Sequence, residues 1–176
     1  MKYDPAVTLA DVSREDLLGM LGDFARNWLA HDGLWFLEIE KRRGMEEAIA
    51  CDKGAWEQFT VLEARRIMKR HGIPAGSGLE GLKKALGLRL YAFMNEQEIV
   101  DETEDGFTFR MNACRVQHAR HRKGLPDFPC KEVGIEEYAG FARTIDPDIT
   151  TECLCCPPDP HPDTHFCAWR FSIHKG

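Results

Sequence analysis

The chain has 176 residues, with 23 Lys and Arg against 29 Asp and Glu, and its formal net charge is -6. This negative balance argues against binding of a nucleic-acid backbone, and no uninterrupted apolar stretch approaches the roughly 20 residues that span a bilayer. The first residues also lack the charged region and the apolar region of a secretory signal. We therefore expect a cytoplasmic protein that binds neither nucleic acid nor membrane.

Helical periodicity dominates the first half of the chain. Apolar residues recur at helical spacing in segments 13–30, 34–43, 45–71 and 79–98. The tripeptide His31-Asp32-Gly33 predicts the end of the first helix, Gly44 predicts the end of the second, and residues 72–78 are the clearest helix-breaking segment. Residues 1–98 are predicted to form a helical segment that packs on the rest of one compact domain.

The second half of the chain mixes strands and helices. Residues 107–112 alternate between apolar and polar, and Asp105-Gly106 before them is a hairpin signal that makes 99–103 the partner strand. The other predicted elements are helices at 115–123 and 130–144 and strands at 149–155 and 166–173. We predict an α+β fold in which residues 99–176 form a cysteine-rich segment with an antiparallel sheet of about four strands and packed helices.

Seven cysteines without a secretory signal predict reduced thiols, and thiols at this density are typical of a metal site. Cys153 and Cys156 have the C-x-x-C spacing of zinc ligands at a strand end, Cys167 lies on the next predicted strand, and Cys130 opens a helix. We predict that these four cysteines hold a structural zinc ion. A four-thiolate iron–sulfur cluster and metal-free buried thiols are the alternatives.

The fourth ligand of this site stays open at the level of sequence. Cys155 can replace Cys156, and Cys114 is a further candidate. His161 and His165 are spaced to bind one ion from a helix, although the prolines on both sides of His161 disfavour a helix there.

A second candidate site surrounds Cys114, which ends a predicted strand and precedes Arg115. A thiol beside cationic groups has a lowered pKa and can act as a nucleophile, with His118 as its base. Arg115 and Arg120 are candidates for binding a ligand carboxylate, with a solvated helix face as the alternative. The helical aromatic residues form either core or the wall of a small-molecule pocket between helices and sheet. They are Trp28, Trp35, Phe36, Trp56 and Phe59.

Four runs carry a resemblance to known families: residues 35–40, 64–67, 124–131 and 156–159. Through these runs, nearly the whole chain resembles the L-2-amino-thiazoline-4-carboxylic acid hydrolase family. It is most similar to the uncharacterised relatives of that family in domain-of-unknown-function family 6125. The order of cysteines in residues 107–173 also resembles the small-molecule-binding domains of the 4-vinyl-reductase type. Some sensor members of that group hold zinc, which implies Cys130, Cys153 and Cys167 as ligands, with Glu152 or Cys156 as the fourth.

The leading functional prediction is a cytoplasmic small-molecule-binding protein with a structural, cysteine-ligated metal site, and a homodimer is compatible with it. The alternative is a hydrolase of a small cyclic amide or amidine, similar to the thiazoline-carboxylate hydrolases. Its nucleophile would be Cys114 or a metal-bound water. Closed coordination by four protein ligands favours the binding protein, whereas Cys114 within hydrogen-bond reach of His118 favours the enzyme.

Overall fold

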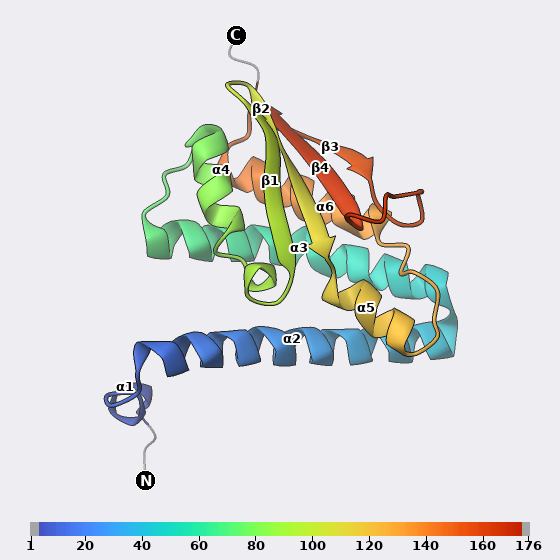
Figure 1. Cartoon of the computed structure of the whole chain (residues 1–176), viewed down its shortest axis with the longest axis horizontal. Helices are drawn as coiled ribbons and strands as arrows, with labels where there is room; N and C mark the ends of the chain where they lie inside the picture. Colours follow the sequence, from blue (N-terminus) through green and yellow to red (C-terminus); the bar gives the residue numbers. More distant parts are fainter. Residues whose placement is uncertain (1–3, 174–176) are drawn as a thin grey trace.

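A computed structural model describes residues 4–173 (Figure 1). Its helices are α1 (Pro5–Thr8), α2 (Arg14–Arg43), α3 (Met45–His71), α4 (Gly78–Leu86), the 3-10 helix η1 (Leu90–Phe93), α5 (Arg115–Arg122) and α6 (Lys131–Ile145). Its strands are β1 (Glu96–Thr103), β2 (Gly106–Ala113), β3 (Ile149–Cys155) and β4 (Cys167–Ile173), all antiparallel in the order β1-β2-β4-β3. The predicted α+β class is confirmed. No helix within residues 4–173 is long and apolar enough to cross a membrane.

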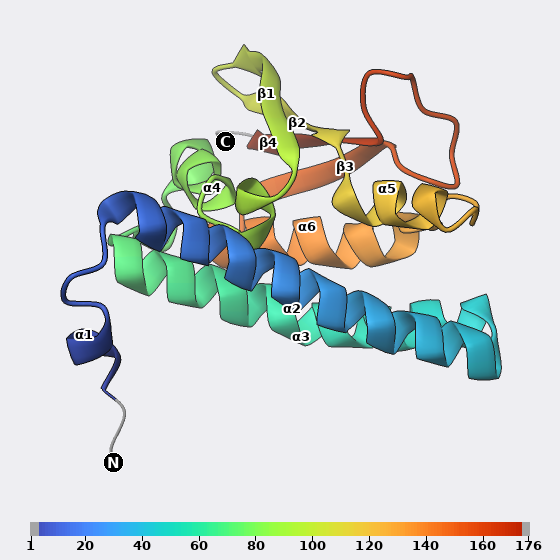
Figure 2. The same cartoon turned by 60° about the horizontal axis from the view of Figure 1, so that its bottom comes forward.

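The elements stack in layers, with the sheet on one side, α6 next to it, and the long antiparallel pair α2 and α3 beyond α6 (Figure 2). Alternate residues of the central strands turn large apolar side chains toward α6. The core between the sheet and α6 includes Phe107, Phe109, Trp169, Phe171 and, from the helix, Phe141. This core buries one face of the sheet.

Two glycines of α6 set the distances between these layers. A Cβ atom at Gly134 would lie 2.7 Å from a ring carbon of Trp169 on β4, and one at Gly140 would lie 2.7 Å from Cγ2 of Thr60 on α3. Thr60 also donates a 2.7 Å hydrogen bond from its hydroxyl to the backbone oxygen of Glu137. Helix α6 therefore touches the sheet on one side and α3 on the other through its backbone.

Helix α2 is continuous where the sequence predicts a break at His31-Asp32-Gly33. Ser13 caps its first turn by accepting a 3.0 Å hydrogen bond from the backbone N–H of Asp16, and the helix ends as predicted at Gly44, which has φ of 92°. A glycine inside a helix costs only about 1 kcal/mol relative to alanine, and packing along α3 outweighs that cost. The unbroken helix carries Asp32 on its inner side.

The predicted helix over 79–98 is instead three elements, α4, η1 and the start of β1. Helix α4 ends at Gly87, and the backbone of Arg89 is extended, with φ of -71° and ψ of 155°. The chain leaves the helical path at Arg89, because its backbone is extended and its side chain forms buried ion pairs with Glu63 and Glu137. The helical spacing of apolar residues continues past Leu86 to Leu90, which is why the periodicity alone predicted one helix.

Candidate functional site

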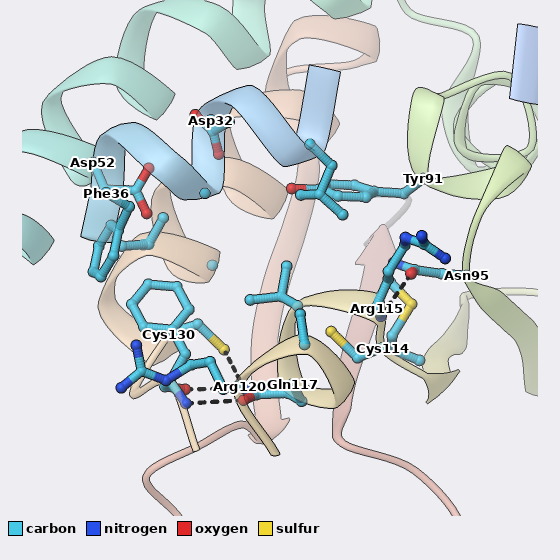
Figure 3. Close-up of a pocket in the computed structure, with 18 of the residues that line it drawn as sticks. Asp32, Phe36, Asp52, Tyr91, Asn95, Cys114, Arg115, Gln117, Arg120 and Cys130 are labelled. Carbon is cyan, nitrogen blue, oxygen red and sulfur yellow. Dashed lines mark hydrogen bonds between the residues drawn. The ribbon is translucent and has the colours of Figure 1, made fainter. Parts of the chain in front are cut away.

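A cavity of about 440 Å³ lies between α2, α3, η1, α5, α6 and the adjacent ends of β2 and β4 (Figure 3). Most of its wall is apolar, with Leu29 and Phe36 from α2, Trp56 from α3, and Phe128 and Val133 around the start of α6. Sites for small organic molecules have volumes of about 300–1,000 Å³ and mostly apolar walls with a few polar groups. The cavity meets both criteria.

One wall of the cavity is acidic, formed by Asp32 from α2 and Asp52 from α3 (Figure 3). Burial raises the pKa of Asp32. Burial, together with the charges of Asp32 and Glu137, raises the pKa of Asp52 to about 7, although a hydrogen bond with Trp56 lowers it. The carboxyl group of Asp52 therefore changes charge near neutral pH, and a positive charge in the cavity would stabilise its ionised form.

Arg89 holds the elements behind this acidic wall together. Its guanidinium is 2% exposed and lies 2.8 Å from Glu63 of α3 and 2.7 Å from Glu137 of α6. Burial lowers the pKa of Arg89, but the charges of Glu63 and Glu137 raise it above its ordinary value. Four aromatic rings surround the guanidinium with centroids 4.6–5.7 Å away. They are those of Trp56, Tyr91, Tyr138 and Phe141. This network fixes Tyr91 at the edge of the cavity.

The opposite wall carries thiols. It is formed by Cys114, Cys130, Cys156 and Cys167. The sulfurs of Cys130 and Cys156 are 3.5 Å apart, and Gln117 donates a 3.6 Å hydrogen bond to the sulfur of Cys130. Hydrogen bonds with Cys130 and Cys167, together with burial, raise the pKa of Cys156 well above its ordinary value. The amide of Gln117 is itself held by the backbone N–H and C=O of Phe128 at 2.8 and 2.9 Å.

Three of the four predicted zinc ligands, Cys130, Cys156 and Cys167, meet at this thiol wall. Cys153 does not line it; it lies on β3 opposite Trp169, and burial raises its pKa to about 11. The fourth cysteine that lines the cavity is Cys114 rather than Cys153. In the part of the chain from residue 4 to 173, no group of three or more His, Cys, Asp or Glu side chains is arranged to hold a metal ion. Zinc ligation and the iron–sulfur alternative stay predictions.

The other candidate ligands lie away from the thiol wall. Cys155 follows a register shift on β3, and Glu152 on the same strand is exposed. The ring of His161 packs on Phe166 with centroids 5.3 Å apart, and His165 contacts the hydroxyl of Thr164 at 3.0 Å. These four candidate ligands do not line the cavity: they are Glu152, Cys155, His161 and His165.

The hydrogen bonds of the Cys114 thiol come from the backbone of Val116 and Gln117 rather than from His118, and a catalytic role of Cys114 and His118 stays a prediction. Cys114 lines the cavity, whereas His118 is exposed on α5, and its ring packs edge-on against Phe166. The expected lowering of the Cys114 pKa is wrong, because burial raises that pKa to about 12 against the weaker effect of the Gln117 backbone N–H. A thiol with this pKa is protonated at neutral pH and is a poor nucleophile.

The three predicted ligand-binding residues, Arg115, Arg120 and Trp35, lie in different positions relative to the cavity. Arg120 donates to both carboxylate oxygens of Glu40 at 3.0 and 3.3 Å and to the backbone oxygen of Pro126, so its guanidinium ties α5 to α2. Arg115 is exposed at the edge of the cavity, with its backbone N–H bonded to Asn95. Trp35 is 63% exposed and outside the cavity, while its neighbour Phe36 points inward (Figure 3).

Sequence reasoning missed the acidic wall, although a signal for it exists. Asp32 is four residues from both Trp28 and Phe36, and Asp52 is four residues before Trp56. Both acids therefore lie on the apolar stripe of their helix rather than on its solvent face. A charged residue on such a stripe indicates either a buried ion pair or a binding site.

Comparison with known proteins adds a family but no activity. No curated protein matches the chain significantly. The sequence model described as "Family of unknown function (DUF6125)" matches residues 10–173. Because this match covers nearly all of the chain, including every residue of the cavity described above, the protein belongs to the family of unknown function DUF6125.

Proposed function

We propose that the protein binds a small organic molecule in the cavity between α2, α3, α5 and α6. The observation that carries this proposal is a cavity of about 440 Å³ whose mostly apolar wall also presents Asp32, Asp52 and Tyr91. The sequence resemblance to small-molecule-binding domains of the 4-vinyl-reductase type supports the same conclusion. Hydrolysis with Cys114 as the nucleophile has less support, because the pKa of this thiol is raised to about 12.

Val116 offers a direct test, because its side chain lines the cavity from α5. In Val116→Phe the added ring atoms fill part of the cavity, and Val7→Phe makes the same change at a side chain that is 74% exposed. Fragments of different charge are screened by protein-observed NMR against the wild type and both variants. We expect hits that shift resonances of cavity residues, and at least tenfold weaker binding to Val116→Phe alone. The proposal fails when no fragment shifts these resonances, or when all hits bind Val116→Phe unchanged.

We also propose a structural metal at the cysteine-rich end of the cavity. Its support is the contact of the Cys156 thiol with Cys130 at 3.5 Å and with Cys167. A four-ligand zinc site needs one further donor, for which Cys153 and Cys114 are the candidates. Such an ion would hold the start of α6 against β4 and the loop after β3, and would contribute to folding.

Elemental analysis and native thiol counting test the metal. One equivalent of zinc per chain with about three reactive thiols is the expected result, and a serine variant of the fourth ligand should lose zinc while Cys51→Ser, at an exposed position on α3, keeps it. A metal-free protein with seven reactive thiols would refute the proposal. Zinc retained in Cys153→Ser and lost in Cys114→Ser would assign the fourth ligand to Cys114.

A further inference from the structure

Neither carboxylate of the acidic wall forms an ion pair with any residue in the range 4–173. Asp32 comes from α2 and Asp52 from α3, and the two carboxylates lie on the same side of the cavity, where the hydroxyl of Tyr91 also points (Figure 3). Across residues 4–173, no Lys, Arg or His nitrogen lies within 4.0 Å of either carboxylate. Partly buried carboxylates without a counter-ion are unfavourable unless they are protonated or a cation binds beside them.

Burial raises the pKa of Asp32 and the charge of His31, its neighbour on α2, lowers it, although no nitrogen of His31 forms an ion pair with the carboxylate. The other cations near the cavity pair with acids of the protein or come from α5. Behind the acidic wall, Arg89 is shared by Glu63 and Glu137. The cationic side chains that line the cavity from α2 and α5 are Arg26, Arg115, Arg120, Arg122 and Lys123. Of these, Arg26 pairs with Asp23 at 2.9 Å and Arg120 with Glu40 at 3.0 Å. At the inner end of the cavity, the charges of Asp32 and Glu137 add to burial in raising the pKa of Asp52, which agrees with an excess of negative charge there.

Aromatic side chains adjoin these carboxylates. The rings of Trp56 and Tyr91 are stacked with centroids 6.0 Å apart, both residues line the cavity, and Trp56 forms a hydrogen bond with Asp52. Phe36 of α2 adds a third ring to the wall. Aromatic faces attract organic cations through their quadrupole and also pack against flat apolar groups. The combination of carboxylates and rings favours an organic cation over a neutral hydrocarbon.

A buried donor without a partner independently indicates a ligand. Trp169 lines the cavity from β4 and is 1% exposed, and its indole N–H has no hydrogen-bond acceptor among the residues of the structure, 4–173. Buried donors without acceptors are uncommon in folded proteins. An acceptor atom on a bound molecule would satisfy this N–H.

A metal ion fits the acidic wall poorly. Calcium and magnesium take six or more oxygen ligands, several of them from protein carboxylates and carbonyls. Asp32 and Asp52 supply too few ligands, and the third acid that lines the cavity, Glu137, is paired with Arg89 at 2.7 Å. Within residues 4–173, no group of three or more His, Cys, Asp or Glu side chains is arranged to hold a metal ion. The charge that these carboxylates attract is therefore better carried by a nitrogen of an organic molecule.

Resting on the proposed function of the cavity, we propose that its ligand is a small organic ammonium ion with a flat apolar body. The charged nitrogen lies between Asp32 and Asp52, and the body packs against Trp56 and Tyr91. Molecules of the same shape with a neutral or negative group at that position bind more weakly, because they leave the carboxylates unpaired or repel them.

The test compares three probes of one shape: tryptamine, its neutral alcohol tryptophol, and the anion indole-3-propionate. Binding is measured by calorimetry, and cavity resonances in NMR spectra locate each probe. We expect tryptamine to bind at least about tenfold more tightly than tryptophol and indole-3-propionate to bind most weakly, since charge-assisted hydrogen bonds are the stronger ones. Asp32→Asn/Asp52→Asn should remove the preference for tryptamine, while Glu57→Gln, an exposed acid on α3, should keep it.

The outcomes separate this inference from the proposed function. If tryptophol or indole-3-propionate shifts the cavity resonances with affinity equal to that of tryptamine, the ammonium preference is refuted and small-molecule binding stands. If tryptamine keeps its preference in Asp32→Asn/Asp52→Asn, the assignment of the charge to these carboxylates is refuted. If none of the three probes shifts a cavity resonance, the ammonium inference is refuted, and a fragment screen that also yields no cavity hit refutes the proposed function.

Discussion

Arg89 Nη1 lies 2.7 Å from Glu137 Oε1, and each of these two side chains is more than nine-tenths buried. The pair joins the chain before η1 to the middle of α6, and the same guanidinium reaches Glu63 on α3 at 2.8 Å. Because three elements distant in sequence meet at one buried cation, the position of Tyr91 beside the cavity depends on this contact.

Removing the guanidinium should strongly destabilise the fold. Arg89→Met leaves Glu63 and Glu137 buried without a counter-ion, and breaking a buried pair in this way costs about 3–5 kcal/mol. Urea denaturation at pH 7.5 measures the loss. The matched control is Arg42→Met, whose exposed pair with Glu38 should contribute less than about 0.5 kcal/mol. Equal stabilities of the two variants would show that the buried network is not important for folding.

The stability of the protein should fall as pH rises from about 5 to about 7.5. The pKa of Asp52 is raised from 3.8 to about 7, so between these values the folded state binds the proton more tightly than the unfolded chain does. The stabilisation is complete below the unfolded pKa and is lost as pH rises through the folded pKa, with a slope of at most about 1.4 kcal/mol per pH unit for one group. The pKa of Glu137 is also raised to about 7 and acts in the same direction.

Asp52→Asn isolates the contribution of Asp52 to this slope. The amide does not titrate, so the variant should lose less stability than the wild type between pH 5 and pH 7.5 in urea denaturation. Asp148→Asn changes an exposed acid and should leave the slope unchanged. A wild-type stability that rises over this interval would contradict the raised pKa values.

The spacing of α3 and α6 can be tested at Gly140. In Gly140→Ala the new Cβ would lie 2.7 Å from Thr60 Cγ2, and overpacking of this kind costs about 1–3 kcal/mol. Thr60→Ser removes that methyl group and keeps the hydroxyl that bonds to the Glu137 backbone oxygen at 2.7 Å, so the double variant should be more stable than Gly140→Ala. Thermal denaturation measures both.

Gly54→Ala is the control for the helix propensity of alanine. Gly54 has no neighbouring atom within 4 Å of the new Cβ, and the substitution should stabilise α3 by up to about 1 kcal/mol. A Gly140→Ala variant that gains as much stability as Gly54→Ala would mean that α3 and α6 are farther apart than described.

Cys114 should react slowly with an alkylating reagent. Burial raises its pKa to about 12, so the reactive thiolate is scarce at pH 8, whereas Cys51 is exposed on α3. Peptide mapping by mass spectrometry after a short treatment with iodoacetamide should find Cys51 modified well before Cys114. The reverse order would restore Cys114 as a candidate nucleophile, and denatured protein provides the reference in which both thiols react.

The sequence alone determined the features that depend on neighbouring residues. Gly44 and Gly72 end their helices as predicted, with φ of 92° and 62°, because glycine adopts positive φ without steric strain. The turn before Gly106 joins two paired strands, as the alternation of residues 107–112 predicts. The same local rules located β3 and β4 and the two helices that precede them, α5 and α6, since each depends on a period of 2 or 3.6 residues.

The tertiary structure alone decided where the chain departs from these local rules and which side chains meet. Helix α2 runs through Gly33 because packing on α3 outweighs a small local preference, and the chain leaves the helical path at Arg89 to place a buried cation. The C-x-x-C spacing indicated Cys153 as a zinc ligand, yet Cys114 lies with the cavity thiols.

The acidic wall also depends on the tertiary structure. Asp32 and Asp52 come from different helices, and they are brought together only when α2 folds back on α3. Spacing along one chain cannot report such proximity, since the position of each side chain in the cavity is set by contacts between elements that are distant in sequence.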